Sequence, residues 1–501
     1  MKNNSLRFIV RSLTLSSLLT GCKVGPNYHP PETLMPTAFV EDREEDTFAV
    51  SDENLCRWWT RFNDPFLDQL LEESISGSFD YHIALEKICQ ARAQYQIQFA
   101  QIFPEIELEG SGSRFRASES FASNTLTTGG SVPAPTPTPA ATTALSPFRN
   151  FFQVGLDAIW EIDLFGKLRR SSEAAYDLWE ASAEDARAVK ISVISEVANI
   201  YVAICALQKK IRVQSESMQL DEDLVTLSRL KFESGLSSAQ EIDGFIATLE
   251  ADRAALVLLQ TALRQNIYSL AVLLGRVPES LVDEFQTIHS IPSATGRVPA
   301  GLPGDLLRRR PDILSAERNL ASATEQIGVA VADLFPSLSL TGSSSSFAAN
   351  PLQGANVGYA SDTLRNLFKP ASLVWGIGGF ITWPVLDFGK RMATVDVQVS
   401  IERQAYLTYQ KTVVSALQET ESALIAYFNE EVRVASINRQ TEANQSSFNY
   451  IKDLYEAGLA DYLQVLQVKE QFLASQLSLA DSQQAVATDL IAIYKAMGGD
   501  W

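Results

Sequence analysis

The sequence predicts a mainly α-helical protein that also carries membrane-spanning β-strands and is built from two copies of one structural unit. The stretch 160–170, WEIDLFGKLRR, returns 223 residues later at 383–393 as WPVLDFGKRMA. Before each copy, apolar and polar residues alternate as in a strand. After each copy, about 68 residues contain no Pro or Gly, as in a long helix. A motif whose flanking patterns recur at a fixed offset indicates an internal two-fold repeat.

The first 21 residues have the order of a secretory signal, with basic residues, a short apolar run and small residues before Cys22. The string LLTGC at 18–22 resembles the lipobox of bacterial lipoproteins, in which the cysteine is acylated. Cys22 is therefore the predicted lipidation site, with a covalent diacylglycerol and an N-acyl lipid and no other cofactor. The residue after the cysteine is Lys23. An Asp at that position would retain a lipoprotein in the inner membrane, so the lysine predicts delivery to the outer membrane.

Composition excludes several classes of protein. Lys and Arg total 41 against 60 Asp and Glu, a formal charge of −19 without a basic block, which argues against nucleic acid as a partner. No run of eighteen or more uninterrupted apolar residues is present, so any membrane crossing must be made by strands. No His/Cys cluster, nucleophile motif or phosphate-binding loop is found, which predicts neither an enzyme nor a metal site. Cys56, Cys89 and Cys205 are interpreted as small apolar fillers.

The repeat sets the predicted domain boundaries. Residues 22–64 are expected to be a lipid-anchored extended segment, because their prolines disfavour helix. The first repeat covers 65–290 and the second covers 291–501. Each repeat is predicted to contain a helix, a β-hairpin and a long helical hairpin; the hairpins lie at 105–160 and 167–274 in the first repeat and at 337–386 and 390–497 in the second.

Four strands are predicted at 105–109, 152–160, 337–342 and 373–383, because apolar residues alternate with polar ones there. Polar loops connect the strands of each pair, and the second loop, after 342, is rich in Ser, Asn and Gly. The alternative is a half-buried sheet of a soluble domain. The signal and the apolar faces ending in matching aromatics favour a membrane sheet.

The repeated motif is predicted to join a membrane strand to a helix. Trp160 and Trp383 are expected at the membrane interface, where indoles are favoured. Gly166 and Gly389 are expected to allow the backbone to turn from sheet to helix geometry.

The long helix after each turn corresponds to a rod of about 100 Å. Each rod is predicted to break at a glycine and to be followed by a returning helix of about half its length. The tips of these hairpins are Gly235, Leu236, Gly458 and Leu459. The returning helix covers only part of the rod, and the helix before each β-hairpin is about as long as the part that remains. We therefore expect one continuous helix to lie beside two shorter helices stacked end to end.

Four strands do not close a barrel, since the smallest membrane barrels have about eight. Open strand edges are not tolerated in lipid. The chain is therefore expected to share a barrel with copies of itself, in which two chains would supply eight strands and three would supply twelve.

Several stretches resemble the TolC/OprM-type outer-membrane efflux proteins, in particular the lipoprotein branch that serves RND pumps. They are RWWTRFNDPFLDQLL at 57–71, WEIDLFGKLRRSSEAA at 160–175, PVLDFGKR at 384–391 and the stretch 301–342, which contains RRPDI. The resemblance implies a homotrimer with one shared 12-stranded β-barrel in the outer membrane lipid, continued by a long periplasmic α-helical barrel. It also implies a periplasmic adaptor (membrane fusion protein) and an inner-membrane RND-type pump as partners, and passive conduction of drugs or other small molecules.

In this family the tube narrows at the helix-return turns, where aspartate rings and a bulky apolar residue form the constriction. Leu463 falls on the apolar position, but Gln464 and Gln467 stand at the aspartate positions. The hypothesis is a mostly neutral gate lined by Leu463 and Gln467, and the alternative is a set of solvated polar residues at a helix start. The residues that can still supply acidity are Asp461, Glu241 and Asp243.

Two other functions are weighed against the efflux duct. An exit duct for type I protein secretion has the same architecture, and only the resemblance of RRPDI and of the lipobox favours the RND branch. A periplasmic coiled-coil adaptor or scaffold lipoprotein would contain one helical hairpin beside β modules, which the 223-residue repeat and the two β-hairpins argue against.

Overall fold

The structure is a computed structural model that describes residues 23–41, 47–48, 57–116, 148–293, 298–299, 302–340 and 355–499. The predicted signal, the lipidation site Cys22, and Cys56 lie outside the described residues. The chain forms two compact units. The sheet unit comprises Met1–His29, Arg92–Tyr176 and Ala321–Arg403, and the hairpin unit comprises Pro30–Ala91, Asp177–Leu320 and Gln404–Trp501. Each unit combines segments of both repeats, so the compact units do not follow the repeat boundaries.

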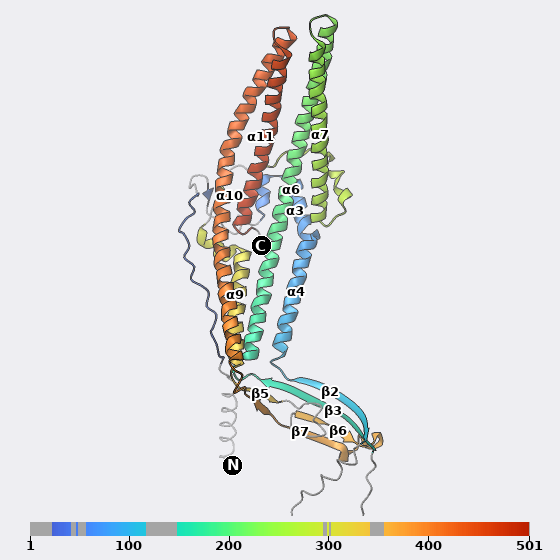
Figure 1. The fold of residues 1–501 in the computed structure, drawn as a ribbon, viewed down its shortest axis with the longest axis vertical. Helices are drawn as coiled ribbons and strands as arrows, with labels where there is room; N and C mark the ends of the chain where they lie inside the picture. The colour runs from blue at the N-terminus through green and yellow to red at the C-terminus, as the bar shows by residue number, and fades with distance from the viewer. Residues whose placement is uncertain are drawn as a thin grey trace, which may run out of the picture. The chain divides into compact units, whose positions relative to one another are not determined.

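Six of the described helices come in three pairs of equal length. The long pair is α6 (Lys167–Glu233) and α10 (Lys390–Glu456), with 67 residues each. The returning pair is α7 (Ala239–Leu273) and α11 (Tyr462–Ala496), with 35 residues each. The helices before the strands are α4 (Phe79–Ala100) and α9 (Pro311–Ala332), with 22 residues each. These matching lengths confirm the predicted repeat, and Figure 1 shows α6–α7 and α10–α11 as two helical hairpins.

The sheet contains four lines of strand, two of which are interrupted. The strands are β2 (Glu105–Arg116), β3 (Phe148–Ile162), β5 (Ser337–Leu340), β6 (Ala355–Ser361), β7 (Leu373–Ile377) and β8 (Phe380–Thr382). β2 pairs along β3 in antiparallel register. β5 and β6 pair one after the other with the opposite edge of β3. β8 pairs with β5, and β7 pairs with β6.

The prediction of a loop after residue 342 is wrong for 355–361, which forms β6. This segment contains Gly358, which pairs with Gly155 of β3. A Cβ atom on Gly358 would lie 2.5 Å from the Cα of Gly155, so the two strands approach closely through paired glycines. Glycine has a weak intrinsic preference for strands. The partner strand, which local sequence reasoning does not include, therefore decides the conformation here.

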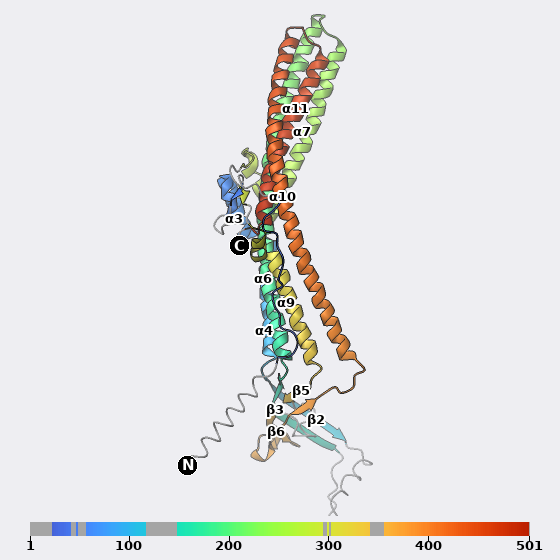
Figure 2. The same ribbon diagram turned by 90° about the vertical axis from the view of Figure 1, so that its left-hand side faces the viewer.

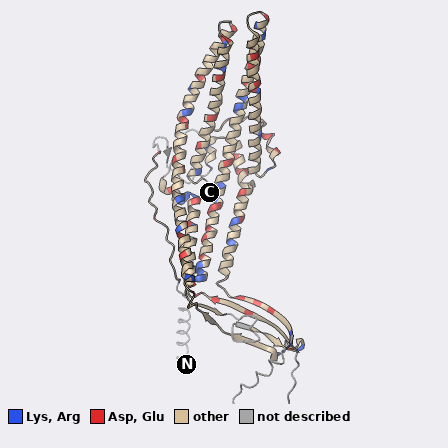
Figure 3. Cartoon of the chain, in the orientation of Figure 1, with Lys and Arg blue, Asp and Glu red and all other residues tan. Residues whose placement is uncertain are grey.

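One face of the sheet is apolar and exposed. Leu108, Leu156, Val357 and Trp375 are paired in one row across β2, β3, β6 and β7. Their exposed fractions are 75, 47, 46 and 70%. The neighbouring row, one residue along each strand, contains Glu107 and Asp157. Figure 3 shows the acidic positions along β2 in red. The predicted alternation of faces is thus present.

The core of the hairpin unit includes the motif at 57–71. Its residues form a 3-10 helix, η1 (Trp58–Phe62), and α3 (Pro65–Gly77). Asp64 caps α3 by accepting from the amide of Phe66 at 3.0 Å, and the Tyr201 hydroxyl of α6 donates to its other oxygen at 2.6 Å. Trp58 stacks on Tyr494 of α11 with 5.0 Å between ring centroids. The motif therefore joins the N-terminal segment to both helical hairpins.

Short elements connect the repeats and the strands. They are β1 (Thr47–Phe48), parallel to β4 (Val298–Pro299), the helix α8 (Leu306–Arg309), and the 3-10 helices Pro278–Leu281, Glu284–Gln286, Pro303–Asp305, Leu364–Asn366 and Pro370–Ser372. In the RRPDI motif, Arg310 donates to Glu419 of α10 at 2.7 Å and to the carbonyl of Ala496 at the end of α11 at 3.0 Å. The motif thus links the start of α9 to the second helical hairpin.

Candidate functional site

The two hairpin tips have the same backbone structure. Gly235 (φ +72°) follows the end of α6 and Gly458 (φ +75°) follows the end of α10, both in the left-handed region that favours glycine. The amide of Leu236 donates to the carbonyl of Lys231, and that of Leu459 to the carbonyl of Leu454, each at 2.8 Å, as in a Schellman motif. Leu236 and Leu459 are 78 and 76% exposed. Each predicted tip therefore presents a leucine to solvent.

The tips of the two hairpins are joined by three residues that we call the tip latch: Lys231 of α6, Glu241 of α7 and Tyr455 of α10. The Tyr455 hydroxyl donates to the Glu241 carboxylate, and the Lys231 ammonium donates to the Tyr455 carbonyl at 2.5 Å. The same ammonium lies 3.4 Å from the centroid of the Tyr455 ring. Tyr455 is 2% and Glu241 9% exposed. Figure 2 shows the tips of the two hairpins at the same end of the hairpin unit.

Burial affects the protonation of the tip latch. It raises the pKa of Tyr455, and the facing Glu241 carboxylate raises it further. Burial also lowers the pKa of Lys231, although the charge of Glu241 opposes that shift. The tyrosine thus remains a hydrogen-bond donor to the carboxylate at neutral pH.

The structure separates the residues predicted for the gate. Glu241 is buried in the tip latch, whereas Asp243 and Asp461 are exposed. Asp461 caps α11 by accepting from the amide of Leu463 at 3.4 Å. Leu463 is 57% exposed, and Gln464 and Gln467 are also exposed. The surface beside Leu463 thus carries two amides and the capping carboxylate, while Glu241 is committed to Tyr455.

A second connection between the hairpins is a buried ionic triad of Lys469, Asp221 and Asp252. The Lys469 ammonium lies 2.5 Å from Asp221 of α6 and 3.1 Å from Asp252 of α7. Ser217 donates to Asp252 at 2.8 Å. Lys469 is 2% exposed and Asp221 is fully buried. One cation of α11 therefore neutralises carboxylates on both helices of the other hairpin.

The two carboxylates of the ionic triad shift in opposite directions. Burial raises the pKa of Asp221 to about 6, although Lys469 opposes the shift, and its Oδ2 atom has no hydrogen-bond partner. For Asp252, burial alone would raise the pKa. The charge of Lys469 and the hydrogen bond from the Ser217 hydroxyl outweigh that effect, so the pKa of Asp252 lies below its ordinary value. The stability that Asp221 contributes is therefore lost as pH rises through about 6. The contribution of Asp252 is lost instead as pH falls through its lowered pKa.

In the sheet unit, a fully buried Arg170 holds the residues that follow Cys22. Its guanidinium donates to Glu325 at 2.6 Å and to the carbonyls of Val24 and Gly25 at 3.1 and 3.2 Å. The amide of Val24 donates to the carbonyl of Phe165 at 3.2 Å. We call these contacts the Arg170 clamp. They place the start of the described chain beside the first strand-to-helix turn.

The two copies of the repeated motif share a left-handed glycine and a tryptophan hydrogen bond, although Trp160 lies within β3 and Trp383 follows β8. Gly166 (φ +84°) and Gly389 (φ +86°) are left-handed at the start of α6 and α10, as predicted. The indole of Trp160 donates to the carbonyl of Ile102 at 2.9 Å, and that of Trp383 donates to the carbonyl of Leu334 at 3.2 Å. Each tryptophan therefore ties the end of a strand to the chain that leaves the preceding helix.

Among the described helices, α6 alone contains a window long and apolar enough to cross a membrane, by length and composition only. That window is 56% buried within the chain. Val197 and Tyr201 of α6 are fully buried in the main apolar core of the hairpin unit. Packing within the protein thus accounts for the apolar character of this helix.

The described residues contain no group of three or more His, Cys, Asp or Glu side chains that could hold a metal ion. Cys205 is buried, but Cys89 is exposed on α4. The interpretation as an apolar filler therefore holds for Cys205 and is wrong for Cys89.

Several residues of the site escape sequence reasoning because helix periodicity does not distinguish them. The signal that marks them is a difference between the repeats. At the offset of 223, Arg170 corresponds to Ala393, Tyr455 to Phe232 and Lys469 to Ile246; Asp221 and Asp252 correspond to Asn444 and Ser475. The guanidinium, the ammonium, the tyrosine hydroxyl and the two carboxylates each occur in one copy only, which is the pattern expected for contacts between the copies or with the N-terminal segment.

Comparisons with known proteins agree with the repeat and with the fold. The family model described as outer membrane efflux protein matches residues 70–276 and 302–499. Nodulation protein T of Rhizobium leguminosarum bv. trifolii is 29% identical over 97% of this chain and 96% of that protein. The probable efflux pump outer membrane protein TtgC of Pseudomonas putida is 29% identical over 97% of this chain and 94% of that protein. The solved structure of the outer-membrane channel OprN is 28% identical, with a TM-score of 0.83 over 95% of this chain and 99% of that chain.

Removing the cation of the ionic triad should destabilise the hairpin unit. At pH 8, Lys469→Met is expected to lower the free energy of unfolding by about 3–5 kcal/mol, because two buried carboxylates lose their partner. The deficit should shrink below pH 6, where Asp221 takes up a proton. Urea unfolding monitored by circular dichroism, at pH 8 and again below pH 6, measures this difference in the free energy of unfolding. The control is Arg253→Ala, which removes an exposed cation from two ion pairs. Equal effects of the two variants at pH 8 would contradict the prediction.

Proposed function

Because the chain belongs to the outer membrane efflux protein family, we propose that three copies of it form the outer-membrane exit duct of a tripartite pump. Family membership makes the protein an outer membrane channel of an efflux system and not an enzyme, and it removes the adaptor alternative. The proposed cargo is drugs or other small molecules, which pass from the periplasm to the exterior. Transport through the duct is passive, and its energy comes from an RND-type inner-membrane pump.

The observation that carries the proposal is the combination of an apolar exposed face and two open edges in one sheet. Among the described strands, β2 pairs only with β3, and β7 and β8 pair only with β6 and β5. Unpaired backbone groups are costly in lipid, so both edges need a partner strand. Further copies of the chain supply it: three copies give twelve lines of strand, as the resemblance implies. The apolar row with Leu108 and Trp375 then faces lipid, and the row with Glu107 faces the lumen.

The hairpin tips are the proposed periplasmic end of the duct. Leu236 and Leu459 are exposed there, and exposed leucines at the ends of paired helices suit an apolar contact with a periplasmic adaptor. Leu463 and Gln467 line the proposed gate. The tip latch and the ionic triad hold the two hairpins of one chain together, so opening at this end requires the hydrogen bond between Tyr455 and Glu241 to break.

We also propose that the protein is anchored by lipid on Cys22. The Arg170 clamp supports this, because it holds Val24 and Gly25 against the strand-to-helix turn that follows Trp160. A Cβ atom on Gly166 would lie 3.1 Å from the Cα of Lys23, so Lys23 contacts this turn. With Trp160 at the inner lipid boundary, an acyl chain on Cys22, the residue before Lys23, starts at that boundary.

Shortening the side chain at the proposed constriction should widen it. Leu463→Ala is expected to raise the single-channel conductance of the purified protein in planar bilayers and to increase leakage of large antibiotics into cells. Leu459→Ala is the matched control, because it removes an exposed leucine from the tip without changing the predicted constriction. Conductance of Leu463→Ala equal to that of the wild type would exclude Leu463 as the constriction.

Weakening the tip latch should favour the open channel. In Tyr455→Phe the Glu241 carboxylate loses its hydroxyl partner, a hydrogen bond to a charged group of about 1.5–3 kcal/mol. We therefore expect an open probability in planar bilayers at least about tenfold higher than that of the wild type, if the channel is closed at rest. Tyr450→Phe removes an exposed hydroxyl of the same helix and should leave the open probability unchanged. Equal open probabilities for both variants would show that the latch does not restrain the gate.

Replacement of the predicted lipid attachment site gives a direct test of anchoring. The N-terminal peptide of the wild-type protein, purified from outer membranes, is expected to begin at residue 22 and to carry the mass of three acyl chains. Cys22→Ser should lack this mass, as measured by mass spectrometry. A wild-type peptide without lipid would refute the anchor while leaving the channel proposal intact.

A further inference from the structure

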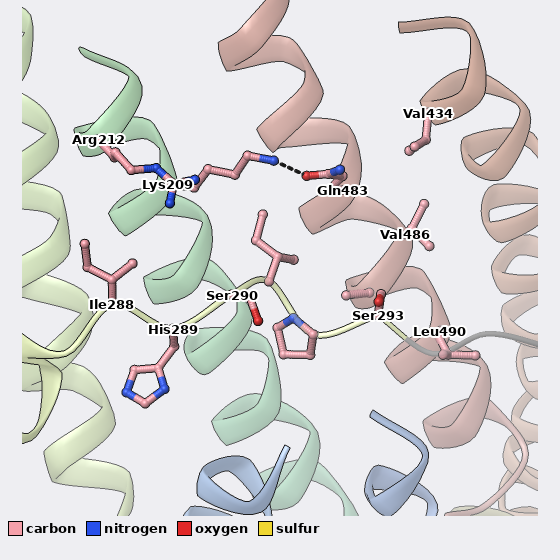
Figure 4. Close-up of a pocket in the computed structure, with 13 residues that line it drawn as sticks. Lys209, Arg212, Ile288, His289, Ser290, Ser293, Val434, Gln483, Val486 and Leu490 are labelled. Carbon is pink, nitrogen blue, oxygen red and sulfur yellow. Dashed lines mark hydrogen bonds between the residues drawn. The ribbon is translucent and has the colours of Figure 1, made fainter. Parts of the chain in front are cut away.

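The hairpin unit contains a cavity of about 490 Å³ between α6 and α11, crossed by the segment 288–293 that leads out of the first repeat. Figure 4 shows Lys209 and Arg212 of α6 on one side of it and Gln483, Val486 and Leu490 of α11 on the other. Cavities of this size hold small molecules in many proteins. Lys209 is 26 residues before Gly235, about 40 Å along the helix, so the cavity is separate from the tips.

The polar part of the cavity is cationic. Lys209 and Arg212 are three residues apart and lie on the same side of α6. The Lys209 ammonium donates to the side-chain oxygen of Gln483, a neutral acceptor. Within the described part of the chain, no carboxylate is paired with Lys209, whereas its neighbour Lys210 pairs with Asp481. Arg212 has Glu216 at 4.0 Å, with both side chains more than half exposed, which is a weak interaction.

This positive charge is unusual in its surroundings. The whole chain has a formal charge of −19, yet these two cations face one cavity, and the exposed Glu216 beside Arg212 is the one carboxylate paired with either of them among the described residues. Burial lowers the pKa of Lys209, and the charge of Arg212 lowers it further. An anion between them would relieve both effects, because it attracts the two cations and replaces part of their lost hydration.

The remaining wall of the cavity is mostly apolar, although His289, Ser290 and Ser293 of the crossing segment also line it. Its apolar residues come from the crossing segment, α10 and α11; they are Ile288, Ile291, Pro292, Val434, Val486 and Leu490. Two contacts of His289 fix the crossing segment in place. Its backbone amide donates to the side-chain oxygen of Gln208 at 2.9 Å, and the His289 imidazole stacks on the Phe66 ring with 4.6 Å between centroids. The cavity is therefore formed before any ligand enters.

We propose that this cavity binds a small amphipathic anion, with a carboxylate or sulfonate between Lys209 and Arg212 and an apolar body against Val486 and Leu490. The bound molecule contacts α6 of the first helical hairpin and α11 of the second, and so links the two repeats. The proposal does not depend on the efflux function.

Isothermal titration calorimetry of the purified full-length protein in a neutral maltoside detergent tests it, with 2-naphthoate as the probe and detergent micelles alone as the blank. Two further probes separate charge from apolar contact. The cation 2-naphthylmethylammonium has the same apolar body, and inorganic phosphate has the charge without it. Binding of 2-naphthoate with no binding of either control ligand is expected. Equal binding of the cation, or of phosphate, would overturn the proposal.

Variants then assign the binding to this cavity. Lys209→Gln with Arg212→Gln should raise the Kd of 2-naphthoate at least about tenfold, because the anion loses both charged partners. Lys210→Gln, which removes the adjacent cation, should leave the Kd unchanged. Val486→Trp should abolish binding by filling the apolar part. An unchanged Kd in the double variant, or an equal loss in Lys210→Gln, would show that the cavity is not the site.

Discussion

A sheet that faces lipid needs a hydrogen-bond partner along every edge, and the proposed assembly of this protein depends on that constraint. One chain provides four lines of strand, with β2 at one edge and β7 and β8 at the other. Its exposed apolar row, from Leu108 to Trp375, is suited to lipid, but its edges are not. Copies of the chain resolve the conflict by pairing edge to edge.

The internal repeat supplies a framework, and the departures from it supply the specific contacts. Helices of 67, 35 and 22 residues occur twice, so the two copies have matching hairpins, turns and tips. The polar groups that join the copies occur once. Lys469 faces Asp221 and Asp252 across the two hairpins, whereas its counterpart is Ile246. The carboxylates likewise have Asn444 and Ser475 as their counterparts, so the ionic triad forms once and not twice.

The tips combine a restraint with an exposed surface. Glu241 and Tyr455 are buried, and a buried carboxylate whose hydroxyl partner leaves pays the full cost of its lost hydrogen bond. The first turns of α11, which follow Tyr455 in the sequence, expose Leu463, Gln464 and Gln467. In the proposed duct, the latch therefore controls whether the hairpins can move, while the exposed residues control what passes. In this proposal, Gln464 and Gln467, which stand where the resemblance implies aspartates, act on the second property and not on the first.

The sequence alone determined the class of fold, the two-fold repeat, the strand-to-helix turns at Gly166 and Gly389, and the tips at Gly235 and Gly458. Each depends on local chemistry: periodic apolar residues, long stretches without Pro or Gly, and glycines where the backbone is left-handed. The tertiary structure decided what local patterns cannot contain. It made 355–361 a strand through the paired glycines Gly155 and Gly358, and it placed Glu241 in a buried latch rather than among the exposed acidic residues. Arg170, Lys469 and Tyr455 acquire their roles from partners more than 140 residues away in the chain. Such contacts depend on distance in space, which no pattern within a single helix specifies.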